Sequence, residues 1–313
     1  MRYGLPYKGS KNGIAEWIVN NLPSAEIFVD LFFGGGAVTH RAMLSGKYKR
    51  FIVNDIDARL PKLFLDCAYG KYTVENHPEW ITREEFNARK EEDAYIALVW
   101  SFANNGKDYI YGDDLEGFKH QYHIAVFEDK PELLKPYGYN ITSTHKQNAY
   151  DRYLEFNRQI KAIARNDLDS IVRQIEIERL QSLQSLQSLQ SHGVDYQEVP
   201  IPEGALIYCD IPYLGTNCGK YDRFDHERFY SWAWKQDNIF ISEYKMERGF
   251  IEVANIEKTV LSASNGNDQK TTEKIFTNPK TYERLSDDFK RRIRYATAKQ
   301  MTLFDMGYNP YQE

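Results

Sequence analysis

The stretch Ile27-Phe28-Val29-Asp30-Leu31-Phe32-Phe33-Gly34-Gly35-Gly36 decides the fold class. Its first six residues are apolar apart from Asp30, which indicates a buried strand, and the three glycines end that strand. The residues 37–44 then follow a helical pattern that closes at Gly46. A buried strand, a glycine turn and a helix in this order are typical of parallel α/β sheets.

The same alternation extends on both sides of this stretch. Helical spacing precedes it at 14–22, and a strand at 51–54 and an amphipathic helix at 60–67 follow it. Three later segments are also expected to be buried strands, at 205–209, 239–242 and 259–262. The order predicts an α/β protein with a parallel sheet and helices on both of its faces.

The alternation stops between about residues 70 and 150. This region is rich in Tyr and Asn, with turns such as Asn104-Asn105-Gly106, and predicts a separate, loop-rich insertion. A long helical pattern follows from Arg152 to Gln190 and ends in four Leu-Gln-Ser triplets at 180–191. Leucines that repeat every three residues advance by about 300° per step, so they drift around a helix and form no heptad seam. We interpret the repeat as a spacer.

Composition excludes several classes of protein. The 313 residues carry 40 basic and 45 acidic side chains, so bulk electrostatic attraction to nucleic acid is excluded and phosphate contacts must come from local patches. The run Lys290-Arg291-Arg292-Ile293-Arg294 is either such a patch or a solvated helix face. The chain has no run of 18 apolar residues and its N-terminal residues lack the apolar core of a signal peptide. We therefore expect a cytoplasmic protein without membrane contact.

The cysteines and histidines predict no metal site. Three cysteines without close spacing argue against a disulfide scaffold or a cysteine-rich metal site. His120 and His123 are spaced as metal ligands can be, but no Cys or carboxylate lies suitably near them in the sequence. Surface histidines are the simpler interpretation.

The glycine turn and the next strand end indicate a nucleotide-like ligand. Backbone amides at such a turn can receive one at the helix N-terminus, although a plain tight turn looks the same. A dinucleotide fingerprint requires a third glycine where this chain has Thr39, which disfavours NAD. Asp55, 19 residues after Gly36, is placed to accept hydrogen bonds from both ribose hydroxyls, or else to cap the helix near Asp57. Together these features favour a cofactor that contains adenosine.

The sequence Asp210-Ile211-Pro212-Tyr213 follows the strand at 205–209. The Asp210 carboxylate and the Ile211 carbonyl can accept both hydrogens of an aromatic amino group, on which the Tyr213 ring can stack. Pro212 disfavours the helical region for Ile211, so the carbonyl of Ile211 can point into a site. Such a tetrapeptide is often only a turn, but its place after a buried strand predicts a receptor for a planar amine.

The order of these motifs resembles the Dam-type DNA adenine methyltransferases, of the D12 class and alpha group, over nearly the whole chain. The resemblance rests on Tyr7 and Lys11, the segments 30–36, 54–57 and 210–213, and the insertion between them. It implies a Rossmann-like S-adenosylmethionine domain made of 1–70 and 191–313. It further implies an inserted DNA target-recognition domain at 71–165 and a helical spacer at 166–190.

The resemblance also implies roles for individual residues. Tyr7 would stack near the adenosine, Lys11 would pair with the methionine carboxylate, and Asp55 would bind the ribose. The implied cofactor-binding set is Tyr7, Lys11, Asp30, Phe32, Gly34, Gly36, Asp55 and Asp195, of which Asp195 fits a surface turn equally well. The implied catalytic set, which holds a flipped adenine, is Asp210, Ile211, Pro212 and Tyr213. Asn104, Asn105, Lys107 and Tyr109 resemble a DNA-reading loop, although Asn-Gly is also a common turn.

The resemblance thus implies a site-specific enzyme that moves a methyl group from S-adenosyl-L-methionine to the 6-amino group of a flipped adenine in double-stranded DNA. Asp210 matches the adenine-specific pattern, since cytosine-modifying relatives tend to carry Ser there. Ile211 replaces a family proline, which loosens the unfolded chain by about 0.4–1 kcal/mol without removing a substrate contact, so we expect activity to survive.

Two alternatives stay open: a weak or inactive DNA-binding homologue that keeps the cofactor pocket, and a nicotinamide-dependent oxidoreductase, which Thr39 disfavours. We expect a monomer, with a dimer on DNA possible, in a bacterial or phage-infected cell. A restriction-modification or prophage setting fits the compact layout.

Overall fold

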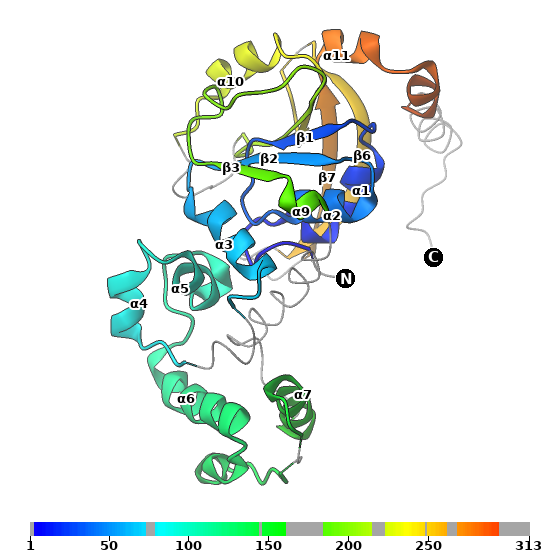
Figure 1. Cartoon of the computed structure of the whole chain (residues 1–313). Helices are drawn as coiled ribbons and strands as arrows, with labels where there is room; N and C mark the ends of the chain where they lie inside the picture. The colour runs from blue at the N-terminus through cyan, green and yellow to red at the C-terminus, as the bar shows by residue number, and fades with distance from the viewer. Residues whose placement is uncertain are drawn as a thin grey trace, which may run out of the picture.

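The computed structural model describes residues 3–72, 79–143, 146–160, 184–214, 223–247, 249–261 and 268–293. Within these ranges the strands form one seven-stranded sheet in the order β3-β2-β1-β4-β5-β7-β6 (Figure 1). Five strands are parallel, and β7 joins β5 antiparallel. The strands are β1 (Ile27–Asp30), β2 (Arg50–Asn54), β3 (Leu189–His192), β4 (Leu206–Asp210), β5 (Ile239–Glu243), β6 (Ile251–Leu261) and β7 (Asp268–Thr277).

Helices cover both faces of the parallel strands. Alternate residues point to opposite faces, so Phe28 and Tyr208 belong to one apolar cluster and Val29 and Ile207 to the other. The first cluster also includes buried residues of α1 (Ala15–Asn20), α2 (Ala37–Ser45) and α3 (Arg59–Ala68), and the second those of α10 (His226–Ala233). The expected α/β class is therefore confirmed.

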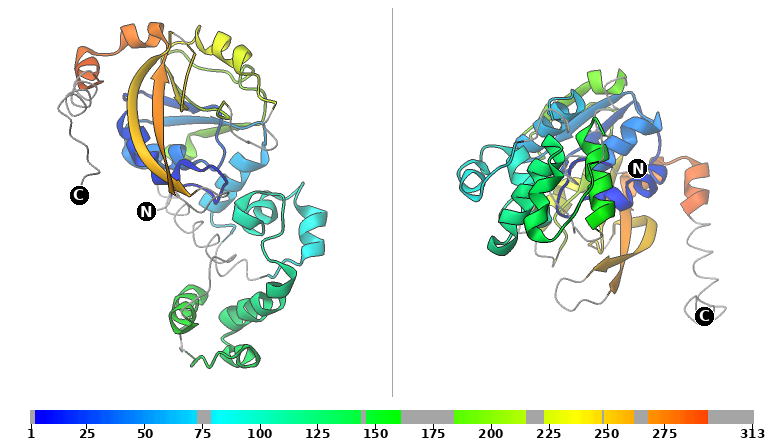
Figure 2. Two further views of the ribbon diagram at one scale, coloured as in Figure 1. Left: turned by 180° about the vertical axis from the view of Figure 1, so that it is seen from behind. Right: turned by 90° about the horizontal axis from the view of Figure 1, so that it is seen from below.

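The antiparallel edge of the sheet was only partly predicted. The strand expected at 259–262 is the end of β6, apart from Ser262, which lies outside the described residues. β6 and β7 form a long hairpin, seen from behind in Figure 2. β7 was missed because most of its residues are polar and it lacks the apolar run that marks a buried strand.

The Leu-Gln-Ser region also differs from the expectation. Leu189 and Gln190 belong to β3, which pairs with β2, so the helical spacer expected to reach 190 is wrong at this end. A short helix, α9 (Gln184–Gln187), precedes the strand, and residues 161–183 lie outside the described residues. β3 is an edge strand, and an edge needs little apolar sequence because only one neighbour pairs with it.

The insertion is helical rather than loop-rich, which corrects the sequence-based expectation. Its helices extend away from the sheet on the side of α3 (Figures 1 and 2). Short capped helices were missed because their apolar patterns are brief; Thr82 and Glu85, for example, form a capping box at the start of α4. The elements are α4 (Arg83–Arg89), α5 (Ala94–Val99), η2 (Phe102–Asn104), α6 (Asp113–Glu128), η3 (Pro131–Tyr137) and α7 (Ala149–Ile160).

The core of the insertion continues into the core of the sheet. Trp100 and Tyr122 belong to the same contiguous apolar cluster as Phe28 and Tyr208. The insertion therefore packs through α5 against α3, which flanks the sheet, and shares one apolar core with the sheet domain. None of the helices within the described ranges is long and apolar enough to cross a membrane.

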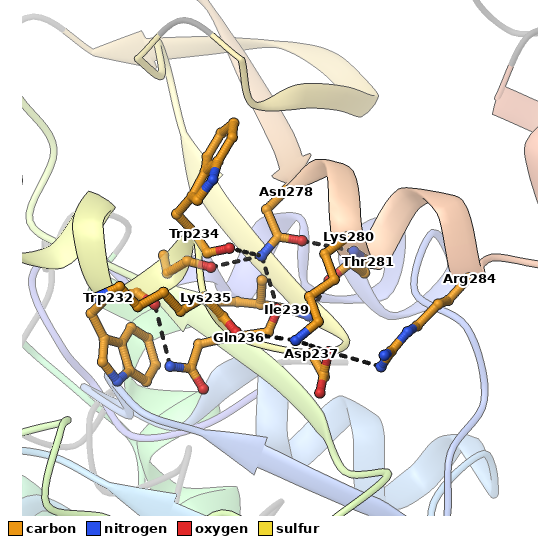
Figure 3. A network of polar contacts seen from close by, with 11 residues as sticks. Trp232, Trp234, Lys235, Gln236, Asp237, Ile239, Asn278, Lys280, Thr281 and Arg284 are labelled. Atoms are coloured by element: carbon orange, nitrogen blue, oxygen red, sulfur yellow. Dashed lines mark hydrogen bonds and ion pairs between the residues drawn. The ribbon is translucent and has the colours of Figure 1, made fainter.

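A polar network fixes the end of β7 beside β5 (Figure 3). The side-chain amide of Asn278 donates to three backbone oxygens of the α10–β5 connection, those of Ala233, Trp234 and Gln236. Its oxygen accepts from the Thr281 amide at 2.7 Å and so caps α11 (Pro279–Arg284). Asp237 pairs with Lys280 at 2.7 Å and with Arg284 at 2.8 Å. These contacts hold the hairpin against the parallel strands.

Candidate functional site

A cavity of about 1380 Å³ lies at the carboxyl ends of β1, β2 and β4. This is the edge at which open α/β sheets bind ligands. All of the predicted catalytic and cofactor-binding residues line the cavity, together with Asn104, Asn105 and Lys107 from the insertion. The structure therefore brings together residues that lie far apart in the sequence.

The glycine turn adopts backbone conformations that side chains rarely tolerate. Gly34 has a φ of +50° and Gly36 a φ of +68°, both in the left-handed region. A Cβ atom on Gly36 would lie 2.2 Å from Cζ of Phe33, and one on Gly35 would lie 2.7 Å from Cβ of Tyr7. Tyr7 therefore packs directly over the turn. The close packing explains why three glycines stand in a row.

Asp55 joins the two strand ends that were predicted to bind adenosine. Its Oδ2 accepts from the Gly34 amide at 2.8 Å and its Oδ1 from the Asp57 amide at 2.9 Å. Asp57, not Asp55, accepts from the Arg59 amide at the start of α3. Asp55 thus holds the glycine turn at the wall of the cavity. Ribose binding by this carboxylate stays a prediction.

Asp30 is a buried carboxylate at the end of β1. The Thr39 hydroxyl donates to its Oδ2 at 2.7 Å. Burial raises the pKa of Asp30 to about 7, and the hydrogen bond from Thr39 opposes that shift. Its Oδ1 is buried and has no hydrogen-bond partner among the described residues. A buried acceptor of this kind, on the wall of a cavity, suits a ligand that carries an ammonium group.

One wall of the cavity is aromatic and ends in an ion pair. The ring centroid of Phe32 lies 5.4 Å from that of Tyr196 and 5.7 Å from that of Phe229. Asp195 binds Arg228 through both oxygens, at 2.9 and 3.1 Å, and also accepts from the Gln197 amide at 3.0 Å. Asp195 therefore lies in a turn, which was one of the two interpretations of its sequence, and that turn borders the cavity.

The segment 210–213 lies in a cluster of charges. Nζ of Lys11 lies 2.9 Å from Oδ1 of Asp210, 3.6 Å from Oε1 of Glu273 and 4.4 Å from the ring centroid of Tyr213. The Tyr213 hydroxyl donates to the same Glu273 oxygen. Burial lowers the pKa of Lys11, but Asp210 and Glu273 outweigh it and raise that pKa above its ordinary value. Lys11 is therefore a firmly held cation.

Two features of this cluster differ from the sequence analysis. Lys11, whose expected role is to bind a carboxylate of the cofactor, also contacts Asp210 and Glu273, and its role toward the cofactor stays a prediction. Glu273 was not singled out at all, because it lies in the polar strand β7, whose existence the apolar pattern did not reveal. Its side chain is fully buried. The only available signal was an acidic residue close to the apolar pair Ile275 and Phe276.

Residues 7–277 match the family model described as D12 class N6 adenine-specific DNA methyltransferase. The chain belongs to this family. Its members use S-adenosyl-L-methionine, and the match spans both the glycine turn and the Asp210 motif. A search among curated proteins found no matching sequence.

Ile211 is the position where this D12 methyltransferase departs from the expected motif. Its side chain is buried in the apolar cluster beneath the cavity, together with Ile241 and Phe229. The carbonyl of the following Pro212 accepts from Nε2 of His226 at 2.7 Å. An apolar side chain thus replaces an apolar ring in an apolar environment, and the turn is held from α10.

The predicted DNA-reading residues divide into two groups. Asn105 accepts from the Lys107 and Asp108 amides and shapes an exposed turn, and Lys107 is itself exposed at the cavity. Asn104 is buried and donates to the Leu98 carbonyl, although it reaches the cavity wall. Tyr109 is buried too, and its hydroxyl donates to the Ile81 carbonyl at 2.7 Å. Tyr109 therefore anchors the turn from inside the insertion and presents no face to DNA.

The two histidines of the insertion lie among aromatic rings. His123 is buried, with its ring centroid 4.5 Å from that of Phe127, so the expected surface position is wrong for this residue. His120 packs on Trp80 at 4.8 Å. In the described part of the chain no group of three or more His, Cys, Asp or Glu side chains is arranged to hold a metal ion.

Proposed function

We propose that the chain is an active, site-specific methyltransferase that modifies the 6-amino group of an adenine flipped out of double-stranded DNA. The observation that supports this best is the shared cavity, in which the glycine turn at 34–36 and the segment 210–213 face one volume. Ligand pockets commonly hold about 300–1,000 Å³. A cavity of about 1380 Å³ exceeds that range and has room for a cofactor together with a base.

The residues present fit S-adenosyl-L-methionine. The buried Oδ1 of Asp30, which has no hydrogen-bond partner in the described ranges, suits the ammonium group of the methionine portion. Tyr7 and Phe32 offer apolar surface to the adenosine. Gly34 and Gly36 let the backbone approach the ligand closely. We assign ribose binding to Asp55. When bound, the cofactor supplies an electrophilic methyl group on a positively charged sulfur.

Asp210 and the Ile211 carbonyl act on the amino group of adenine. That nitrogen is a poor nucleophile because its lone pair is delocalised into the ring. Accepting its two hydrogens at Asp210 and Ile211 favours a tetrahedral nitrogen, and the Asp210 carboxylate stabilises the positive charge that develops there. As the new N–C bond forms, the bond from that methyl group to the sulfur would break and leave a neutral thioether. The nitrogen then loses one proton to Asp210 or to water.

The base must leave the duplex to reach Asp210, at a cost of a few kcal/mol. We assign to the Tyr213 ring the role of stacking on the extruded base. The Lys11 ammonium also lies over this tyrosine ring. We further propose that the insertion at 71–165 reads the target sequence, with Asn105 and Lys107 on the exposed turn that faces the cavity.

Labelled S-adenosyl-L-methionine tests this function directly. The purified protein is incubated with duplex DNA of mixed sequence, the DNA is digested to nucleosides, and label is expected in N6-methyladenine. Asp210→Asn should lower the rate at least about a hundredfold while cofactor affinity changes little. Asp237→Asn, an exposed acid paired with Lys280 away from the cavity, is the matched control. Label found in cytosine, or only in RNA, rejects the proposal.

A second candidate is a DNA-binding homologue with little or no turnover, suggested by Ile211 in the catalytic motif. It predicts cofactor and DNA binding without methylation at any cofactor concentration. An Ile211→Pro variant separates the two cases, since restored turnover in the variant alone would support the inactive homologue. Burial of Ile211 among apolar residues supports the active enzyme.

A further inference from the structure

Glu273 is a buried acid that the assigned steps above do not use. It projects from β7, the antiparallel strand, and its side chain is fully buried. A single atom, Oε1, accepts the Tyr213 hydrogen bond and lies 3.6 Å from the Lys11 ammonium. Glu273 thus contacts Tyr213 directly and is linked to Asp210 through Lys11. Tyr213 and Asp210 are the two side chains assigned to the adenine. Glu273 thus links the antiparallel hairpin to the reacting end of the cavity.

The charges of the cluster explain why a second acid is needed there. Lys11 lies 2.9 Å from Asp210, and an ammonium so close cancels much of the negative field of that carboxylate. With Lys11 and Asp210 alone, the cluster would carry no net charge. Glu273 brings the net charge to −1. A negative cluster attracts the positive charge that develops on the amino nitrogen, whereas a neutral one does so weakly.

We propose that Glu273 is a positioning residue for methyl transfer, which shares Lys11 with Asp210 and keeps the acceptor cluster negative while its Oε1 holds Tyr213 in place. This inference rests on the proposed function, because it concerns the same adenine site. It assigns to β7 a part in the reaction that does not require contact with the substrate.

Other ionisable groups also face this cluster. They come from the neighbouring strands and loops: Asp30 of β1, Tyr208 of β4, Glu243 of β5 and Tyr244 after it. Burial raises the pKa of Glu243 to about 7, and its carboxylate accepts from the Leu214 and Tyr244 amides. The Lys11 ammonium lies 2.9 Å from Asp210 and 3.6 Å from Glu273, so a variant of Glu273 changes a charge in direct ion-pair contact with Lys11.

Two variants of Glu273 separate its charge from its shape. Glu273→Gln keeps the size and an acceptor for Tyr213 but removes the charge, and Glu273→Asp keeps the charge but shortens the side chain. A charge within about 4–6 Å changes a protonation equilibrium about ten- to a thousandfold. We therefore expect Glu273→Gln to lower kcat about tenfold or more, with KM for the cofactor changed less than about twofold. Glu273→Asp should keep more of the activity than Glu273→Gln.

The pH profile gives a readout that a purely structural role would not move. Without the negative charge of Glu273, Asp210 stays ionised to lower pH, so the acidic limb of kcat against pH should move to lower pH in Glu273→Gln. Glu252→Gln is the matched control. Glu252 lies on the adjacent strand β6, and its carboxylate pairs with the ammonium of the half-buried Lys274 at 2.8 Å. The control should leave both kcat and the limb unchanged.

A measurement without turnover keeps this inference separate from the proposed function. NMR of lysine side-chain nitrogens should show that Lys11 loses its proton at lower pH in Glu273→Gln than in the wild-type protein. If the wild-type protein methylates no adenine, the proposed function fails, and the Lys11 titration still tests the charge link. An unchanged Lys11 titration, or equal kcat in Glu273→Gln and Glu252→Gln, overturns the role of Glu273. A thermal unfolding curve for each variant confirms that it is folded.

Discussion

The Thr39 hydroxyl donates a hydrogen bond to Oδ2 of Asp30 across 2.7 Å, and both side chains are buried. Thr39 occupies the position at which a dinucleotide fingerprint would have glycine, so the residue that disfavours NAD also holds the carboxylate assigned to the cofactor ammonium. A side-chain contact therefore joins the end of β1 to α2, the helix that follows the glycine turn.

Thr39→Val should lower the free energy of unfolding by about 1–3 kcal/mol, because the Asp30 carboxylate loses its buried donor. Urea denaturation measures the change. Thr39→Ser keeps the hydroxyl and should lose less stability than Thr39→Val. A loss in Thr39→Ser with none in Thr39→Val would mean that the methyl group, and not the hydrogen bond, matters.

Cofactor binding should strengthen as pH rises through about 7. Burial raises the pKa of Asp30 to about 7, so the side chain is largely protonated below that pH, and only the carboxylate can pair with an ammonium. Binding below pH 7 should then release a proton. Calorimetry at pH 6.0–7.5, in buffers of different ionisation enthalpy, measures this release, and the range stays below the titration of an α-amino group at about 8.

Asp30→Asn should bind the cofactor more weakly and release no proton. Proton release that persists in Asp30→Asn would assign the effect to another group. The same shift has a stability consequence of opposite sign. Because the pKa of Asp30 is raised in the folded state, its contribution to stability is greatest below the unfolded value near 4 and is lost as pH rises through about 7.

Gly36→Ala should destabilise the protein more than Gly46→Ala. Both glycines have a φ near +70°, which costs a non-glycine residue about 1–2 kcal/mol. A Cβ atom on Gly46 meets nothing within 4 Å, whereas one on Gly36 meets the Phe33 ring at 2.2 Å, and overpacking adds about 1–3 kcal/mol. Thermal and urea unfolding of the two variants isolate the contact, since both residues flank the same helix. Equal losses would show that Phe33 moves aside freely.

Lys107→Ala should weaken DNA binding and reduce its salt dependence. Lys107 lies on the exposed turn at the cavity, and one lost phosphate contact should lower the slope of log K against log salt by about 0.9. Fluorescence anisotropy at several salt concentrations measures the slope. Lys280→Ala is the control, because Lys280 lies in α11 and pairs with Asp237 just before β5 (Figure 3). A slope unchanged in Lys107→Ala would place the phosphate contacts elsewhere.

Four of the five parallel strands, β1, β2, β4 and β5, were readable from sequence because each carries its own apolar run. Val29 and Ile207 face one apolar cluster and Phe28 and Tyr208 the other, so both faces demand apolar side chains. β3 and β7 lack such runs, since an edge or hairpin strand can be held by backbone pairing alone. The inserted helices were only partly predicted, since α7 coincides with the start of the helical run expected from Arg152. α4 and α5 were missed because they are short and their caps are local signals that the apolar pattern does not show. α6 is longer, but its apolar residues do not gather on one face.

The site divides in the same way. Asp55 and Asp210 were found because each lies at the end of a buried strand, and topology alone places such residues at one edge. Asp30 was implied only by the family resemblance. The place of Glu273 depends on how an antiparallel strand pairs with β5, and spacing along the chain carries no trace of that pairing. The contact of Lys11 with Asp210 depends on how the N-terminal segment packs beside the end of β4, which spacing does not show either. Tyr109 shows the converse error, because a motif can match while its side chain points inward.

The strand order has a consequence for synthesis of the chain. β1 lies between β2, its near neighbour in sequence, and β4, which follows only after the whole inserted region. During synthesis, the edge of β1 that pairs with β4 therefore stays unpaired until β4 is translated. An unpaired strand edge can associate with other chains. The N-terminal segment packs over the glycine turn, where the Leu5 amide donates to the Gly35 carbonyl at 2.7 Å. Early formation of this contact covers part of the N-terminal half of the chain before β4 is made.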